Sequence, residues 1–154
     1  MNKIKNWMRS IFLKKGGMQE NCEKSEAPKD DEQQVVASEL IRTSQSWDGA
    51  QLPHYLQGSP ELVVKKYVFP PGEKLGWHHH PVMNYGILVK GELTIISLDG
   101  KEKIVREGEA IVEMVDTIHH GENRGSEPVV LYMFYLSGKD LPLSVQHPEI
   151  PLEK

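Results

Sequence analysis

PGEKLGWHHHPVMNYGILVKGEL fills residues 71–93, and GEAIVEMVDTIHHGEN fills residues 108–123. The two stretches hold five of the seven histidines of the chain, in one cluster of three and one of two. β-Branched and aromatic residues surround both clusters, and glycine or proline interrupts them. That pattern is typical of short strands joined by turns. We therefore expect both histidine clusters to lie on strands.

The first cluster, His78-His79-His80, predicts two imidazoles on one face of a strand. Alternate side chains of a strand share a face, so His78 and His80 point one way and His79 points the other. Two imidazoles at this spacing can meet one ion, at metal–nitrogen distances of about 2.0–2.1 Å for zinc. His119 is the candidate for a third ligand, from a distant strand. His79 and His120 are expected to face solvent.

The first stretch resembles the first motif of the cupin superfamily. That motif runs Gly, five residues, His-x-His, three or four residues, Glu, six residues, Gly. Gly72, His78, His80 and Gly91 stand at the matching positions, and Asn84 replaces the Glu. In cupins this Glu is usually the fourth metal ligand, and an amide oxygen is a weaker donor. The resemblance therefore implies that Asn84 binds the metal weakly or through a water.

The second stretch resembles the second cupin motif, which runs Gly, five residues, Pro-x-Gly, two residues, His, three residues, Asn. Gly108, His119 and Asn123 match it, whereas Met114 and Asp116 replace the Pro and the Gly at turn positions. The resemblance implies a small single-domain bacterial cupin. Its expected fold is all-β, an antiparallel double-stranded β-helix or jelly-roll barrel with a pocket inside, frequently assembled as a homodimer.

The strand-like runs along the chain support the same fold class. Asp99-Gly100 is the strongest hairpin signal. Residues 35–137 are expected to form the barrel, with a short helix or strand over 35–42, and residues 138–154 an extended C-terminal tail. The runs expected as strands are 62–69, 75–80, 85–90, 92–98, 102–106, 110–115, 118–123 and 129–136.

Residues 1–34 differ in composition from the rest. Residues 1–17 carry five basic side chains and no acid, with apolar residues at helical spacing. This is a weak basic amphipathic signal, and membrane binding is not expected from it. The polar, charged stretch that follows, to residue 34, is expected to be a disordered acidic linker. Met1 and Met18 both stay open as the start of translation.

The composition excludes several classes of protein. The 154 residues, 17.5 kDa, suit one domain with a tail. The apolar runs are too short for a membrane-spanning helix, and a single cysteine excludes a disulfide scaffold. The net charge of −4 argues against binding to nucleic acid. A cytoplasmic location is expected.

Further residues are candidates for the lining of the pocket: Gly86, Leu88, Glu113, Met114 and Tyr135. Gly86 shares a strand face with Asn84 and either leaves room for a ligand or marks a close backbone approach. Glu113 precedes the second motif and is a candidate base or a carboxylate that supports the metal ligands. An alternative for most of the apolar candidates is ordinary packing in the core.

Two functions remain open from the sequence. A divalent ion (Fe, Mn, Zn or Ni) on three histidines keeps open positions, which suits an oxygenase or isomerase acting on a small anionic metabolite. The alternative is a non-catalytic module that senses or stores a small molecule. The histidines favour the first function, and the Asn84 replacement favours the second.

Overall fold

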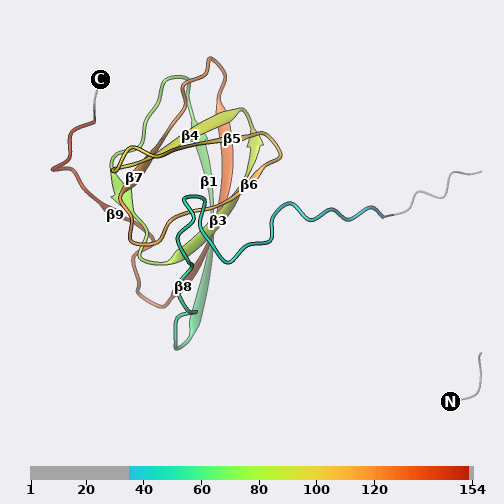
Figure 1. The fold of residues 1–154 in the computed structure, drawn as a ribbon, viewed down its shortest axis with the longest axis vertical. Helices are drawn as coiled ribbons and strands as arrows, with labels where there is room; N and C mark the ends of the chain where they lie inside the picture. The colour runs from blue at the N-terminus through green and yellow to red at the C-terminus, as the bar shows by residue number, and fades with distance from the viewer. Residues whose placement is uncertain (1–34, 153–154) are drawn as a thin grey trace, which may run out of the picture. The chain divides into compact units, whose positions relative to one another are not determined.

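The computed structural model describes residues 35–152, which form nine strands and no helix. Accordingly, no described helix has the length and apolar character needed to cross a bilayer. The predictions for residues 1–34 lie outside the described residues. Figure 1 shows the strands, which are β1 (Pro60–Phe69), β2 (His78–His79), β3 (Met83–Lys90), β4 (Glu92–Ser97), β5 (Glu102–Arg106), β6 (Ala110–Val112), β7 (His119–Glu122), β8 (Val129–Gly138) and β9 (Val145–Gln146).

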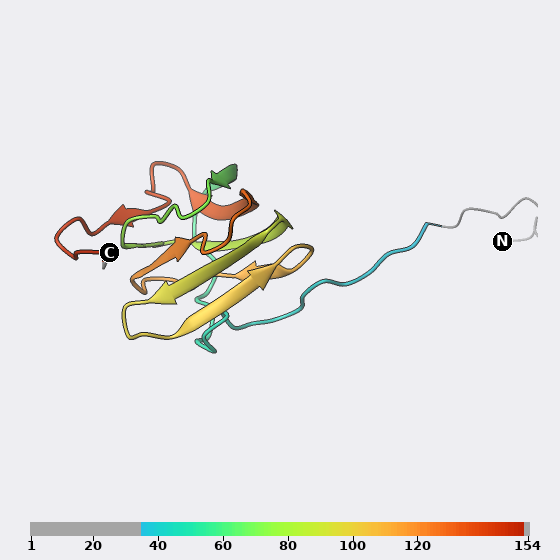
Figure 2. The ribbon, with the colours of Figure 1, turned by 90° about the horizontal axis from the view of Figure 1, so that it is seen from above.

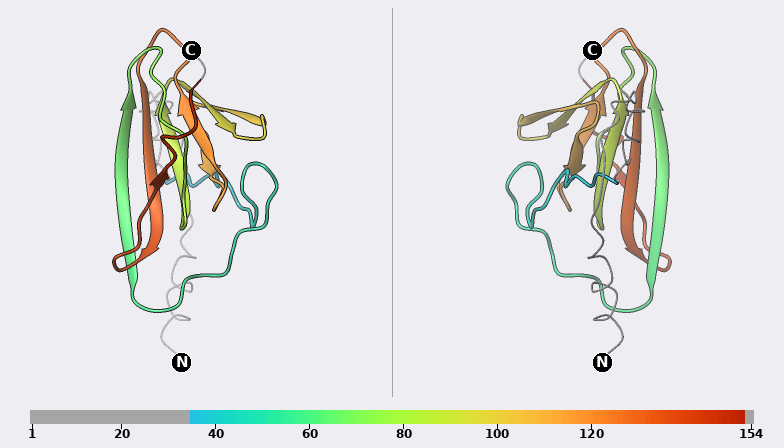
Figure 3. Two further views of the ribbon diagram at one scale, coloured as in Figure 1. Left: turned by 90° about the vertical axis from the view of Figure 1, so that its left-hand side faces the viewer. Right: turned by 90° about the vertical axis from the view of Figure 1, so that its right-hand side faces the viewer.

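The strands form two sheets that face each other (Figure 3). One sheet has the order β1-β8-β3-β6 and the other β5-β4-β7-β2-β9, and all the pairs are antiparallel. Apart from the β4–β5 hairpin, neighbours in a sheet are not consecutive in the sequence, as in a jelly roll. The predicted all-β jelly-roll barrel is confirmed.

The hairpin of β4 and β5 forms where Asp99-Gly100 predicts a turn (Figure 2). Gly100 has a φ of 87°, a conformation that glycine adopts without steric cost. The Ser97 hydroxyl donates a hydrogen bond to the Asp99 carboxylate, and the backbone N–H of Lys101 donates to the Ser97 hydroxyl. Side chains thus close the turn together with the backbone.

The core fills the space between the two sheets. Along β8 the residues alternate between buried and partly buried, and Leu131, Met133 and Tyr135 point inward. Leu93 and Ile95 of β4 meet them from the other sheet. Burying each such side chain contributes about 1.5–3 kcal/mol. The inward-facing side chains of these alternating strands therefore stabilise the barrel.

One local prediction is wrong. Residues 35–42 form neither helix nor strand, and their side chains are exposed. The tail after Gly138 contributes β9, which pairs with β2. The run at 75–80 shortens to the two residues of β2, where pairing partners exist on both sides. The C-terminal tail thereby becomes part of the sheet that carries the first histidine cluster.

Candidate metal centre

Strand pairing brings three histidines together at one end of the barrel. His78 on β2 lies directly opposite His119 on β7, and their ring centroids are 4.7 Å apart. His80 follows β2, and its ring centroid lies 4.9 Å from that of His78 and 5.2 Å from that of His119. All three side chains are buried. The alternation of a strand therefore puts His78 and His80 on the same face, toward the barrel interior.

A backbone carbonyl fixes the orientation of each ring. The Nδ1 atom of His78 lies 2.8 Å from the Gly76 carbonyl, that of His80 2.7 Å from Leu143, and that of His119 2.7 Å from Thr117. A carbonyl oxygen only accepts, so each Nδ1 carries the proton. In a neutral imidazole the Nε2 lone pair is then free. This arrangement is the one that orients metal-binding histidines in proteins.

The three histidines fit a divalent metal ion. Their ligand atoms all lie within 4.8 Å of one another. The Nε2 atom of His119 is buried and has no hydrogen-bond partner among the described residues, although an unpaired buried nitrogen is unfavourable. A metal ion bound by the three rings would supply that missing partner. Imidazole donors suit zinc, iron, copper and nickel.

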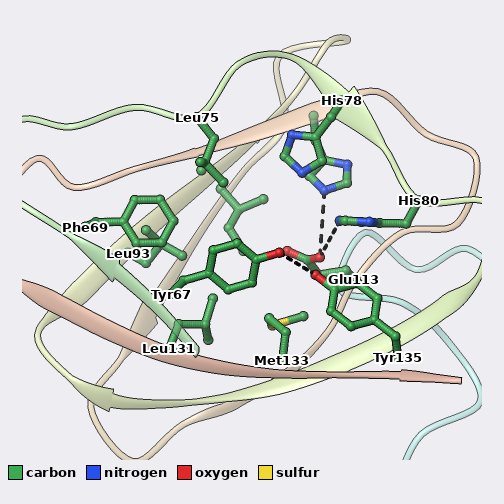
Figure 4. A pocket seen from close by; sticks show the side chains of 13 residues that line it. Tyr67, Phe69, Leu75, His78, His80, Leu93, Glu113, Leu131, Met133 and Tyr135 are labelled. Carbon is green, nitrogen blue, oxygen red and sulfur yellow. Dashed lines mark hydrogen bonds and ion pairs between the residues drawn. The ribbon is translucent and has the colours of Figure 1, made fainter. Parts of the chain in front are cut away.

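Glu113 adds a carboxylate to the same cluster. Its Oε2 atom lies 3.0 Å from His80 Nε2 and 3.9 Å from His119 Nε2 (Figure 4). Burial raises the pKa of Glu113, but the His119 and His80 rings outweigh burial and hold the pKa well below its usual range. The carboxylate is therefore ionised and places a negative charge beside the imidazoles.

The net pKa shifts of two of the histidines have opposite directions. Burial, with the nearby His119 and His80 rings, lowers the pKa of His78 to about 4, so that ring is neutral at pH 7. Burial also lowers the pKa of His119, but the Glu113 carboxylate outweighs it and leaves the pKa above its usual value. Neutral His78 can donate a lone pair to a metal ion. At His119 the Glu113 carboxylate favours a positive charge, which a bound cation would supply in place of a proton.

Two tyrosine hydroxyl groups face the cluster from the other sheet. The hydroxyl oxygens of Tyr67 on β1 and Tyr135 on β8 are 2.9 Å apart, and Figure 4 shows both beside Glu113. Burial raises the pKa of Tyr135, and the hydrogen bond to Tyr67 adds to this effect. Burial also raises the pKa of Tyr67. Both tyrosines stay protonated, and one hydroxyl hydrogen remains available to a ligand.

The cavity between these groups is small. It offers a volume of about 30 Å³ to the centres of water-sized molecules. The cavity therefore holds only water or a small molecule. Its end away from the histidines is apolar in Figure 4. The apolar lining residues are Phe69, Leu75, Leu93, Ile95, Leu131 and Met133.

The other predicted site residues occupy different places. Glu113 and Tyr135 line the cavity, whereas Gly86, Leu88 and Met114 are not among its described lining residues. A Cβ at Gly86 would lie 2.2 Å from Met133 Sδ and 2.6 Å from the Tyr132 carbonyl oxygen. The Met133 side chain and the β8 backbone therefore fill the space beside Gly86, which is a close backbone approach. Leu88 and Met114 are buried.

Asn84 is buried beside the cavity without lining it. Its Nδ2 group donates a 3.5 Å hydrogen bond to the Val82 carbonyl, and its Oδ1 atom has no hydrogen-bond partner among the described residues. Its backbone carbonyl accepts a 3.1 Å hydrogen bond from the Glu113 N–H. In this structure Asn84 therefore holds Glu113 in place through its backbone.

His120 does not face solvent, contrary to expectation. It lies on the opposite face from His119, as alternation predicts, but only 5% of its surface is exposed. Trp77 covers it edge-on, with the ring centroids 4.4 Å apart. His79 is partly buried, because its Nδ1 atom lies 2.8 Å from His147 Nε2 in the C-terminal tail. Both rings therefore serve contacts on the outer face of the barrel.

Sequence reasoning missed the part played by the C-terminal tail. The Leu143 carbonyl orients His80, and the backbone N–H of His147 donates a 2.8 Å hydrogen bond to the Trp77 carbonyl. A backbone carbonyl leaves no sequence signal, and a two-residue strand shows no periodicity. Tyr67 was a candidate for the pocket lining from the sequence, with ordinary core packing as the alternative.

Residues 65–135 match the family described as the cupin domain. Both histidine motifs and most of the barrel lie within these residues, so this part of the chain is a cupin domain. No curated protein matches the chain at a significant level.

Solved structures of other proteins are similar to part of the chain. An oxalate oxidase in complex with glycolate is 28% identical, with a TM-score of 0.49 over 56% of this chain and 46% of that chain. A cupin-like protein of Thermotoga maritima is 17% identical, with a TM-score of 0.48 over 56% and 64%. The DMSP lyase DddQ of Ruegeria pomeroyi is 14% identical, with a TM-score of 0.47 over 55% and 42%. The chain spans less than two thirds of each.

Proposed function

We propose that the protein binds one divalent metal ion through His78, His80 and His119 and uses it to bind a small anionic metabolite. The observation that carries this proposal is that three buried rings, each held at Nδ1 by a backbone carbonyl, lie with their ligand atoms within 4.8 Å of one another. A bound ion would supply Lewis-acid chemistry and an attachment point for a carboxylate or enolate oxygen. The Tyr67 and Tyr135 hydroxyls would donate a hydrogen bond to the same ligand.

The size of the cavity restricts the metabolite. A volume of about 30 Å³ for the centres of water-sized molecules favours a small ligand beside the ion. Small carboxylates are the class that fits both the charge and the volume. The reaction type that we favour is an oxygenase or isomerase step on such an anion.

A non-catalytic binding function is the second candidate. Glu113 is the only carboxylate among the described residues that line the cavity, and it contacts the histidines. Few groups then remain for proton transfer to a substrate. Turnover that rises with iron content favours the enzyme, and binding without turnover under any metal favours the sensor or storage module.

Metal content tests the proposal directly. Protein purified without chelators is analysed for metal, and its affinity for Co²⁺ is measured by competition with a chelator. We expect one ion per chain, and we expect His80→Ala to bind Co²⁺ weakly. His54→Ala is the matched control, because His54 is exposed and lies in coil. Equal metal content in His80→Ala and His54→Ala contradicts the proposal.

The ligand class is tested with probes of increasing size. Formate, acetate and succinate are added to the Co²⁺-loaded protein, and the visible spectrum of the ion is recorded. We expect formate and acetate to change the spectrum at lower concentration than succinate, because the cavity is small. Tighter binding of succinate would show that the volume does not restrict the ligand.

A further inference from the structure

The motif position for the fourth metal ligand lacks a carboxylate, but a carboxylate lies directly across from it. Asn84 occupies the motif position on β3, and β3 pairs with β6 in the register Tyr85↔Val112. Continued by one residue, this register places Glu113 opposite Asn84. The 3.1 Å hydrogen bond from the Glu113 N–H to the Asn84 carbonyl confirms that the pairing extends this far.

Residues directly opposite each other on antiparallel strands project from the same face. Their Cβ atoms are about 4.5–5.5 Å apart. Asn84 and Glu113 are both buried, and Glu113 lines the cavity. The carboxylate of Glu113 therefore enters the barrel at the level where a Glu at position 84 would enter it, one strand further across the sheet.

The distances from Glu113 suit a shared ion. Donor atoms bind such ions at about 2.0–2.2 Å, so two donors of one ion are at most about 4.4 Å apart. Glu113 Oε2 lies 3.0 Å from His80 Nε2 and 3.9 Å from His119 Nε2. Both separations fall within that limit. Glu113 is outside the group whose ligand atoms all lie within 4.8 Å of one another, so its carboxylate must move closer to His78 for all four residues to bind one ion. Asn84 is not among the described residues that line the cavity.

The orientation of His80 suits the same ion. Its Nδ1 atom lies 2.7 Å from the Leu143 carbonyl oxygen, and its Nε2 atom lies 3.0 Å from the Glu113 carboxylate. A metal ion bound at this point would be within reach of His80, His119 and Glu113 together.

We propose that Glu113 is the fourth metal ligand of this protein, in place of the residue at position 84. This proposal rests on the metal site proposed above. The exchange moves the negative ligand from β3 to the end of β6 and keeps three imidazoles and one carboxylate around the ion. The Tyr67 and Tyr135 side chains line the same cavity and would be available to a ligand bound to the ion.

The test compares three variants of the full chain loaded with Co²⁺. Glu113→Gln removes the charge at nearly constant volume, Asn84→Ala removes the side chain at the motif position, and Glu61→Gln is the control for loss of one exposed carboxylate. Affinity is measured by chelator competition and the ligand field by visible absorption. Loss of an outer partner of a metal ligand costs about 10–100-fold in affinity, so we expect a larger loss in Glu113→Gln. We expect a changed spectrum in that variant alone.

Each outcome decides a separate point. If the wild type binds Co²⁺ and Glu113→Gln binds it equally well, or with an unchanged spectrum, Glu113 is not a ligand while the three-histidine site stands. A larger loss in Asn84→Ala than in Glu113→Gln returns the role to position 84. If the wild type binds no metal, both proposals fail. Circular dichroism checks folding, and Glu113→Asp, which keeps the charge but shortens the side chain, replaces Glu113→Gln if that variant does not fold.

Discussion

Gly86 allows a sharp test of how β3 packs against β8. In Gly86→Ala the new Cβ would lie 2.2 Å from Met133 Sδ and 2.6 Å from the Tyr132 carbonyl oxygen, whereas ordinary contacts are 3.4–4 Å. The Met133 side chain can rotate away. The Tyr132 carbonyl cannot, because β8 is paired with β1 on one side and with β3 on the other. The strands must therefore separate locally.

The expected cost follows from these contacts. Overpacking of a core costs about 1–3 kcal/mol and occasionally more, and the lower chain entropy of alanine returns about 0.4–1 kcal/mol. We expect Gly86→Ala to lower the free energy of unfolding by about 2 kcal/mol, which moves the urea midpoint down by about 1 M. Gly76→Ala is the control, because its nearest contact is 3.4 Å. An unchanged midpoint in Gly86→Ala, with weaker binding of formate, would refute the packing argument and show that Gly86 makes room for a ligand.

Three further predictions concern the loop, the tail and the hydroxyl pair. Asp116 has a φ of 55°, a left-handed conformation that a β-branched residue adopts only with strain. In urea denaturation, Asp116→Val should therefore lower the free energy of unfolding by about 1–2 kcal/mol, whereas Asp116→Gly should not. Equal stability of the two variants would argue against strain at this position. A chain ending at Gly138 loses the Leu143 carbonyl that orients His80. Its Co²⁺ affinity should fall by about 10–100-fold in chelator competition, and full affinity would mean that the tail does not orient the ligand. Tyr135→Phe removes one hydroxyl of the hydrogen-bonded pair Tyr67 and Tyr135. In a spectral titration of the Co²⁺-loaded protein, formate binding should weaken by about 1 kcal/mol, roughly five-fold in Kd. Equal Kd values for the variant and the wild type would exclude a contact between this hydroxyl and the anion.

Local patterns predicted the parts of the fold that depend on neighbouring residues. The period of two in a strand was sufficient to separate His78 and His80 from His79, and Asp99-Gly100 was sufficient to locate a hairpin. These signals are reliable because strand alternation and turn conformations are local properties of the chain. The family motifs added the pairing of the two histidine clusters.

The rest depended on contacts between distant segments. That Glu113 lies opposite Asn84 follows from the register of β3 and β6, which spacing alone does not define. His120 became buried because Trp77, on another segment, covers it. The same holds for Gly86, whose two interpretations could be separated only once the position of Met133 was known.

The strand β9 lies beyond the region that matches the cupin family, and yet it pairs with the strand that carries His78. Coupling between two equilibria is reciprocal, so whatever the docked tail adds to metal affinity, the bound ion adds to the docking of the tail. The Val145 amide on β9 should then be better protected from hydrogen exchange when the metal site is filled, so its exchange rate reports on metal binding.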